Sequence, residues 1–239
     1  MQYSKPVISN QHGALVMALL PFLYAQFAEH HQAGFYHLSF GLAWFFLYLF
    51  SYPFFANISK KPTARNRQWA MIYFVLSLIS ALPALFYQPR FLYFILPMLP
   101  LGLIQFYFAK KRDERNLIND IAGILTFGII GIANGFLASD TLNFNYLLHP
   151  SLFFIATTFY IKSMVRERKN PLYMELSIAL HLVLAYLYWE MGFISLFAVY
   201  LFALGRSIIV PSLSWNVKQI GMFEFLTYLL LLIALLISG

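Results

Sequence analysis

The amino-acid sequence predicts an all-α membrane bundle of about nine transmembrane helices, with the N-terminus in the cytoplasm and the C-terminus outside. Of the 239 residues, 61% are hydrophobic and only 10% are charged. The apolar runs are about 17–22 residues long, the length that crosses a bilayer core as a helix. Fifteen of the 16 Lys and Arg residues fall in every second connection between these runs. Because short loops rich in Lys and Arg stay in the cytoplasm, this distribution predicts the orientation.

The predicted spans follow one another along the chain and leave no loop long enough to fold as a separate soluble domain. We expect them at residues 13–29, 36–58, 69–87, 91–109, 117–138, 145–163, 172–189, 193–210 and 221–238. Arg90 lies alone on the outer side. Lys162 lies at the end of the sixth span, and the other basic residues lie in the N-terminal tail and in the connections 59–68, 110–116, 164–171 and 206–220. We therefore predict a single transmembrane domain over residues 1–239.

Polar or interfacial aromatic residues mark the ends of these spans. In chain order they are Gln11 and His12 before Gly13, with Glu29, for the first span, Tyr36 and Asn57 for the second, Trp69 and Tyr87 for the third, Arg90 before the fourth, Asp120 in the fifth, Lys162 in the sixth, Glu175 and Trp189 for the seventh, Arg206 in the eighth and Glu224 in the ninth. Proline residues within several spans predict kinks, and kinked spans often line cavities.

Composition excludes several classes of function. The chain has no cysteine, which excludes disulfides, thiolate catalysis and cysteine-ligated metals. It has no glycine-rich phosphate loop, no nucleophile elbow and no paired-histidine helix motif, and we expect neither a metal nor a cofactor. The formal net charge of +7 follows in part from the topology and does not indicate a nucleic-acid partner. The positive excess on the inner side favours anionic lipid headgroups or an anionic substrate.

Polar and ionisable residues gather at one depth, the cytoplasmic ends of the spans. Charged groups inside a membrane are costly and usually face the interior of a bundle or a cavity. We therefore expect one inner cavity, surrounded by Gln11, His12, Asn57, Arg112, Asn119, Asp120, Lys162, Arg166, Arg206 and Glu224.

The sixth predicted span ends in three cations, Lys162, Arg166 and Lys169, which are spaced i, i+4 and i+7. If the helix continues that far, they form one cationic stripe. Such a stripe either holds an anionic ligand or reaches the headgroups as ordinary inner anchors. Candidate counter-ions within the protein are Asp120, Glu167, Glu175 and Glu224.

Two histidines fit either a structural or a chemical role. His12, at the lip of the first span, is an acid–base group or phosphate ligand in one interpretation and an interfacial cap in the other. His181 lies near mid-depth in the seventh span. It is either a neutral side chain hydrogen-bonded to a neighbouring helix or part of a proton relay.

Four ordered segments carry a resemblance to a known family. They are residues 11–14, 112–120 with Gly123, 160–171 and 218–224. Together they resemble the YwiC-like family of bacterial membrane proteins, and the likeness covers nearly the whole chain. The resemblance implies a multi-pass protein of the bacterial inner membrane.

A more distant likeness concerns architecture. Nine spans, an inner N-terminus and polar segments after spans two, four and six resemble the UbiA-type intramembrane prenyltransferases. That resemblance implies a prenyl diphosphate held through magnesium by Asp-rich motifs after spans two and six. This chain instead has residues 57–61, with two lysines, after span two, and Lys162 and Arg166 after span six. Cations replace the carboxylates, which leaves open whether the chain catalyses a transfer. Arg and Lys can still bind phosphate without a metal.

The leading functional hypothesis is that the chain binds or processes a membrane lipid with an anionic head and a long tail, such as a polyprenyl phosphate. Lys162, Arg166 and Arg112 would hold the head, while Asp120 and Glu224 would orient the basic side chains. The alternative is a non-enzymatic transporter or a structural membrane partner protein. A lipid-sized cavity at the inner polar end would distinguish the first hypothesis from the others.

Overall fold

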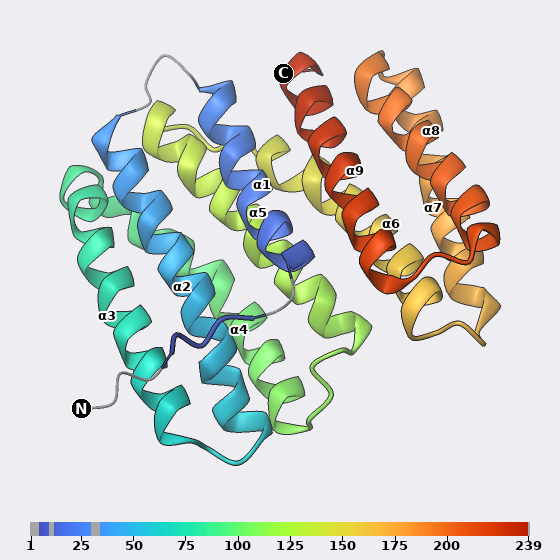
Figure 1. The fold of residues 1–239 in the computed structure, drawn as a ribbon. Coiled ribbons are helices and arrows are strands. Elements are labelled where there is room, and N and C mark those ends of the chain that lie inside the picture. The colour runs from blue at the N-terminus through green and yellow to red at the C-terminus, as the bar shows by residue number, and fades with distance from the viewer. Residues whose placement is uncertain (1–4, 10–11, 30–33, 239) are drawn as a thin grey trace. The chain divides into compact units, whose positions relative to one another are not determined.

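A computed structural model describes residues 5–9, 12–29 and 34–238 of this protein, and all of the regular secondary structure in them is helical (Figure 1). In chain order the elements are α1 (His12–Ala28), α2 (Phe35–Ser59), α3 (Ala64–Tyr87), the 3-10 helix η1 (Pro89–Phe94), α4 (Ile95–Lys110), α5 (Leu117–Ser139), α6 (Asn145–Val165), α7 (Pro171–Glu190), α8 (Ile194–Ile209), the 3-10 helix η2 (Val210–Leu213) and α9 (Val217–Ser238). Every predicted span corresponds to one of the α-helices, so the all-α membrane bundle is confirmed.

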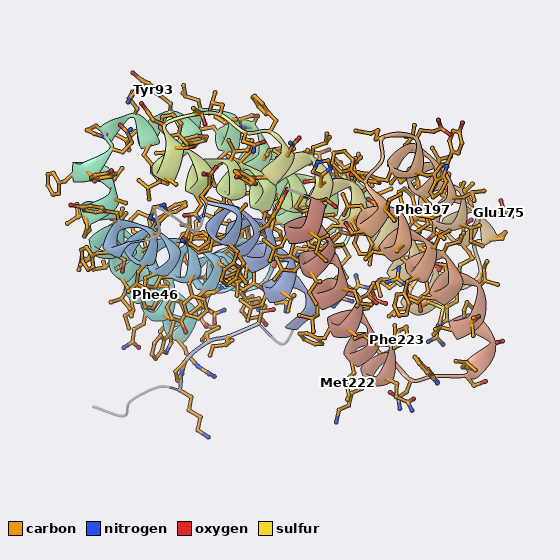
Figure 2. The ribbon with its side chains drawn as sticks, turned by 90° about the horizontal axis from the view of Figure 1, so that it is seen from above. Phe46, Tyr93, Glu175, Phe197, Met222 and Phe223 are labelled. Atoms are coloured by element: carbon orange, nitrogen blue, oxygen red, sulfur yellow. The ribbon has the colours of Figure 1, made fainter. Side chains whose placement is uncertain are left out.

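Seven helical segments in the described part of the chain are long and apolar enough to cross a membrane. Two of these segments join a 3-10 helix to an α-helix, η1 to α4 and α8 to η2, while α1 is a shorter apolar helix. Large apolar side chains point outward, as Tyr93 and Met222 do in Figure 2, with exposed fractions of 68% and 63%. Such exposure fits a lipid environment. The chain is therefore a multi-pass membrane protein, and its expected orientation stays a prediction.

The helices form two compact units, which are described separately below. Unit 1 is Met1–Leu147 and unit 2 is Leu148–Gly239. The boundary falls within α6, so its first residues belong to unit 1 and the rest to unit 2. The expectation of one domain over the whole chain stays a prediction.

In unit 1, α2 packs on α3, and α5 packs on both α1 and α4. The core joins Ala18 and Phe22 of α1 to Trp44 of α2 and Ile130 of α5. Trp44 Nε1 donates a hydrogen bond to the backbone oxygen of Ala18 at 2.9 Å, so a buried polar group is satisfied between two helices.

The contact between α1 and α5 depends on small residues of α5. A Cβ at Gly131 would lie 2.8 Å from the Tyr146 backbone oxygen and 2.9 Å from that of Pro21. One turn later, Gly135 lies against the ring of Tyr146. Between them, Asn134 donates from Nδ2 to the Phe22 backbone oxygen at 3.1 Å. This is the small-xxx-small packing by which membrane helices approach closely.

Two polar contacts lie at the ends of unit 1 and agree with the predicted sides. Arg65 donates to the backbone oxygens of Lys5 and Pro6 at 3.0 and 3.1 Å, so the N-terminal tail lies against the start of α3. Both segments are expected inside. Arg90, the one basic residue expected outside, forms an ion pair with Asp140 at 2.6 Å. Asp140 follows α5, in a connection that is also expected outside.

Unit 2 contains most of α6 and all of α7, α8 and α9, with α8 packed on both α7 and α9. Its aromatic core includes Phe153, Tyr188 and Tyr200. The Tyr188 and Tyr200 rings are stacked with centroids 5.2 Å apart. The α6–α7 and α8–α9 connections lie at the same end of the unit, where they line a common pocket.

Candidate functional site

The most unusual feature of unit 2 is an ion pair buried between α8 and α9. Arg206, in the last turn of α8, donates from Nη1 to Oε2 of Glu224 on α9. Each residue is only 3% exposed. Charges within a membrane span are costly, so each side chain requires a partner, and these two provide it for each other.

The other two helices of unit 2 also contact Arg206. On α6, Thr157 Oγ1 lies 3.5 Å from Nη2, and the guanidinium lies over the Tyr160 ring, 4.2 Å from its centroid. On α7, His181 Nε2 lies 3.4 Å from Nη2. All four helices of unit 2 therefore meet at this arginine. We call Thr157, Tyr160, His181, Arg206 and Glu224 the Arg206 cluster.

His181 acts as a neutral acceptor in this cluster. Its Nδ1 lies 2.7 Å from the backbone oxygen of Ser177, which can only accept, so Nδ1 carries the proton. Nε2 is then an acceptor and faces an N–H of Arg206 on the neighbouring helix. This geometry agrees with the structural interpretation of His181, a buried neutral histidine bonded to another helix.

Several polar atoms of the Arg206 cluster have no hydrogen-bond partner in the part of the chain that the structure describes. They are Arg206 Nε, Glu224 Oε1 and the Tyr160 hydroxyl. Buried polar groups are normally satisfied, so three orphan atoms around one ion pair require an explanation. Together they offer one hydrogen-bond donor, one hydrogen-bond acceptor and one hydroxyl to a polar ligand.

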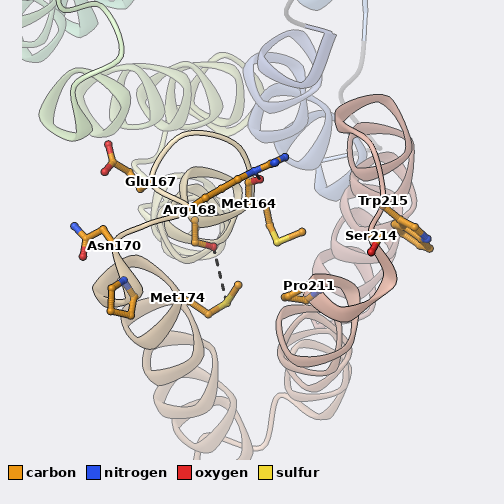
Figure 3. Close-up of a pocket in the computed structure, with 10 residues that line it drawn as sticks. Met164, Glu167, Arg168, Asn170, Met174, Pro211, Ser214 and Trp215 are labelled. Atoms are coloured by element: carbon orange, nitrogen blue, oxygen red, sulfur yellow. Dashed lines mark hydrogen bonds between the residues drawn. The ribbon is translucent and has the colours of Figure 1, made fainter.

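A pocket of about 510 Å³ opens at the same end of unit 2 (Figure 3). Glu167, Arg168 and Asn170 lie on one side of it, on the α6–α7 connection, and Pro211, Ser214 and Trp215 face them from the α8–α9 connection. The remaining lining residues are Ser163, Met164, Pro171 and Met174. The pocket thus combines a polar, partly cationic mouth with an apolar floor.

The pocket floor lies next to the Arg206 cluster. Met164, Met174 and Trp215 line the pocket, and all three pack against the buried core of Tyr160, Val210 and Ile220. Tyr160 in turn covers the guanidinium of Arg206. The pocket lining and the Arg206 cluster therefore pack on the same small core, which contains Tyr160.

The predicted site residues of unit 1 lie at the ends of its helices. Asn57 is half-buried and accepts a hydrogen bond from the Thr63 backbone N–H at 3.3 Å. Asn119 donates to the Glu114 backbone oxygen at 2.7 Å. Arg112 is exposed, in a left-handed conformation with φ of 60°, just after α4.

The other three predicted site residues of unit 1 are Asp120, Gln11 and His12. Asp120 is half-buried in the first turn of α5. Gln11 and the side chain of His12 lie outside the described residues, although His12 begins α1. Whether these residues share a cavity with those of unit 2 stays a prediction.

The cationic stripe expected on the sixth span does not form, because α6 ends at Val165. Lys162 is buried in its last turn, whereas Arg166 and Lys169 lie beyond the helix and are exposed. Asn170 and Pro171 then begin the next helix. Asn170 caps α7 through a 3.2 Å hydrogen bond from the Leu172 N–H, and a proline disfavours helical backbone in the residue before it.

Sequence reasoning selected Arg206 and Glu224 but missed Thr157, Tyr160 and the pocket residue Arg168. One available signal was the spacing of Thr157 and Tyr160, which places a hydroxyl and an aromatic ring on one face of an apolar helix. Another was Arg168, which lies within the basic run after α6.

Comparison with known proteins decides the family. The model of the family described as YwiC-like protein matches residues 8–135. The chain belongs to the YwiC-like family. One YwiC-like relative, an uncharacterized protein of Haemophilus influenzae, is 40% identical over 237 residues, which cover 98% of this chain and 99% of the relative. Another, the uncharacterized protein YwiC of Bacillus subtilis, is 34% identical over 225 residues, 92% of each chain.

The matches to both relatives extend beyond unit 1 into unit 2. No solved structure matches the chain. The architectural likeness to UbiA-type enzymes therefore stays a prediction.

Proposed function

We propose that this YwiC-like protein binds an amphiphile with an anionic head, such as a short or long polyprenyl phosphate, in the pocket of unit 2. The single observation that carries the proposal is the composition of that pocket, which joins a polar mouth, with Arg168 beside Glu167, to an apolar floor. The head would lie at the mouth and the first part of the tail along the floor.

The mouth supplies groups that suit a phosphate. Arg168 is exposed there, and its Nε donates to the Met164 backbone oxygen, which anchors the side chain at the rim. Asn170 and Ser214 add polar groups around it. Arg166 and Lys169 of the α6–α7 connection and Lys218 in the first turn of α9 increase the positive potential at the same end.

The floor supplies the apolar part of the site. Met164, Met174 and Trp215 are half-buried and present flexible or broad apolar surfaces. Methionine adapts to ligands of irregular shape. A volume of about 510 Å³ lies within the roughly 300–1,000 Å³ of ligand pockets. It accommodates a headgroup and a few isoprene carbons, and a longer tail would continue into lipid.

The test is calorimetric binding of a short-chain prenyl phosphate to the purified protein, with the matching prenyl alcohol as the neutral analogue. We expect the phosphate to bind more tightly than the alcohol, and EDTA to leave its affinity unchanged, because Arg binds phosphate directly. Arg168→Gln removes one charged hydrogen-bond donor, which costs on the order of 1–3 kcal/mol, so the affinity falls about ten- to a hundredfold.

Two further variants examine the predicted head ligands, and one serves as control. We expect Lys162→Ala and Arg166→Ala to weaken binding of the phosphate, and Lys60→Gln, an exposed cation of unit 1, to leave it unchanged. Equal affinity for phosphate and alcohol, or full binding by Arg168→Gln, would reject this pocket as the site. Abolition of binding by EDTA would instead support a metal-dependent site.

Transport is a second candidate function, which one observation favours. Buried polar and aromatic side chains continue from Arg206 toward the other end of unit 2. His181 and Tyr200 lie with ring centroids 6.1 Å apart, Tyr200 stacks on Tyr188, and the Tyr188 hydroxyl lies 2.7 Å from His149 Nδ1. Proton flux across proteoliposomes that depends on His149 and His181 would favour transport over simple binding.

A further inference from the structure

We infer that Glu224 is an exchangeable counter-ion: an anionic head that passes the pocket floor replaces Glu224 on Arg206, and Glu224 takes up one proton. This inference rests on the proposed function and deepens it. It adds a second, deeper position for the anionic group and makes binding consume a proton.

The ion pair of Arg206 and Glu224 leaves much of its hydrogen-bonding capacity unused. Arg206 and Glu224 are joined through one nitrogen and one oxygen, and in the described part of the chain Arg206 Nε and Glu224 Oε1 bond to nothing. The Nη2 contacts to Thr157 and His181, at 3.5 and 3.4 Å, are long. Guanidinium groups bind phosphate and carboxylate most strongly through two parallel hydrogen bonds. An incoming phosphate group can therefore satisfy Arg206 better than Glu224 does.

Packed side chains connect the pocket with Arg206. Met164, Met174 and Trp215 line the pocket and pack against the core of Tyr160, Val210 and Ile220, and the guanidinium of Arg206 lies over the Tyr160 ring. The methionines have flexible side chains. The Tyr160 hydroxyl, which bonds to no described residue, is available to donate to an anion in transit. The proposed route opens by rotation of these side chains.

The charges around the ion pair also favour the exchange. Three titratable side chains that interact with the ion pair are Tyr160 of α6, His181 of α7 and Tyr228 of α9, the last on the same helix as Glu224. None of them is a cation, because His181 keeps its Nδ1 proton and accepts at Nε2. Arg206 is thus the only positive charge beside Glu224 among these groups.

Once a ligand anion occupies Arg206, an ionised Glu224 would be a second buried negative charge without a partner. Such a group neutralises instead of staying charged. The proton comes from water through the pocket and binds one carboxylate oxygen, and ligand release returns it. For a singly charged head, the net charge of the cluster is zero before and after the exchange.

The experiment compares the full-length wild-type protein with Glu224→Gln in neutral detergent, using a short-chain prenyl phosphate as the ligand. Titration in buffers of different ionisation enthalpy gives the protons taken up. We expect the wild type to take up about one proton more per ligand than Glu224→Gln. Its affinity should fall, relative to that of the variant, about tenfold for each rise of one pH unit. Protonation of the ligand itself contributes equally to both proteins.

Inorganic sulfate provides an independent probe, because its charge does not change over this pH range. Glu224→Gln leaves Arg206 without its counter-ion, so sulfate should raise the melting temperature of this variant. It should have little effect on the wild type or on the double variant Arg206→Gln/Glu224→Gln. Glu175→Gln, an exposed carboxylate of α7, should behave as the wild type with both probes.

The outcomes separate the two proposals. Prenyl phosphate binding with equal proton uptake in wild type and Glu224→Gln would overturn the exchange and leave the proposed function standing. Stabilisation of Glu224→Gln by sulfate, without prenyl phosphate binding to any variant, would support the deeper anion site and reject the proposed ligand. Absence of both responses would reject both proposals. Failure to recover folded Glu224→Gln even in sulfate would also contradict the inference.

Discussion

At the scale of single residues, the Arg206 cluster follows a general rule for charges in membranes. The free-energy cost of burying a guanidinium and a carboxylate in a helix bundle is offset only when the two neutralise each other and the surrounding helices contribute polar groups. Here Thr157 and His181 supply those groups and Tyr160 supplies a ring face. The same arrangement makes the pair sensitive to the loss of either partner.

The first prediction at this scale concerns stability. Glu224→Gln preserves the size of the side chain and leaves a charged Arg206 unpaired, so we expect the free energy of unfolding to fall by about 3 kcal/mol. The measurement is thermal or chemical unfolding in detergent, without added sulfate or phosphate. Glu175→Gln serves as the exposed control and should change stability by less than about 0.5 kcal/mol.

The double variant Arg206→Met/Glu224→Gln distinguishes an unpaired charge from a packing defect. Because no charge remains to be compensated, we expect it to recover most of the lost stability. A double variant that is as unstable as Glu224→Gln would show that packing, and not the ion pair, holds these helices together.

At the scale of elements, hydropathy and length locate the helices because these properties depend on consecutive residues. The predicted span 117–138 became α5, Leu117–Ser139, and 221–238 lies within α9. Local backbone chemistry shifted other boundaries. Pro89 begins a 3-10 helix before α4, and α6 ends at Val165, before the last two cations of the expected stripe.

The candidate site could be predicted only in part, and for a physical reason. Arg206 and Glu224 stand out in the sequence because charges within apolar spans are rare. Their contacts with Thr157, Tyr160 and His181 depend on how four helices rotate against one another, which hydropathy does not encode. The sequence also offered Glu224 as a counter-ion for the cations of the sixth span, whereas the structure pairs it with Arg206.

The prediction at this scale concerns the contact between α1 and α5. In Gly131→Ala, the new methyl group would meet two backbone oxygens below 3 Å, and backbone atoms cannot rotate away. We expect the variant to lose about 1–3 kcal/mol of unfolding free energy. Gly123→Ala, on the same helix with nothing within 4 Å of its Cβ, should be neutral or gain up to about 1 kcal/mol. Equal losses in both variants would contradict this account of the packing.

At the scale of the whole molecule, charge and polar contacts follow one pattern. Within unit 1, the N-terminal tail meets the start of α3, and Arg90, which is expected outside, pairs with Asp140. Within unit 2, the basic α6–α7 connection and the α8–α9 connection line one pocket. The positive-inside rule places all of the basic connections in the cytoplasm. The central claim is therefore that this pocket opens to the cytoplasm and binds an anionic amphiphile there.

The absence of cysteine from the chain allows a direct test, because one substitution introduces the only thiol. Ser214→Cys places it in the pocket, and Leu142→Cys places it in the exposed connection after α5 as a reference for the other side. The measurement is the rate of labelling by a membrane-impermeant maleimide in right-side-out and inside-out vesicles, with and without a short-chain prenyl phosphate.

We expect Ser214→Cys to be labelled only in inside-out vesicles and Leu142→Cys only in right-side-out vesicles. The prenyl phosphate should slow labelling of Ser214→Cys, whereas the prenyl alcohol should not. Labelling of both thiols from the same side, or a Ser214→Cys rate that the phosphate leaves unchanged, would contradict the central claim.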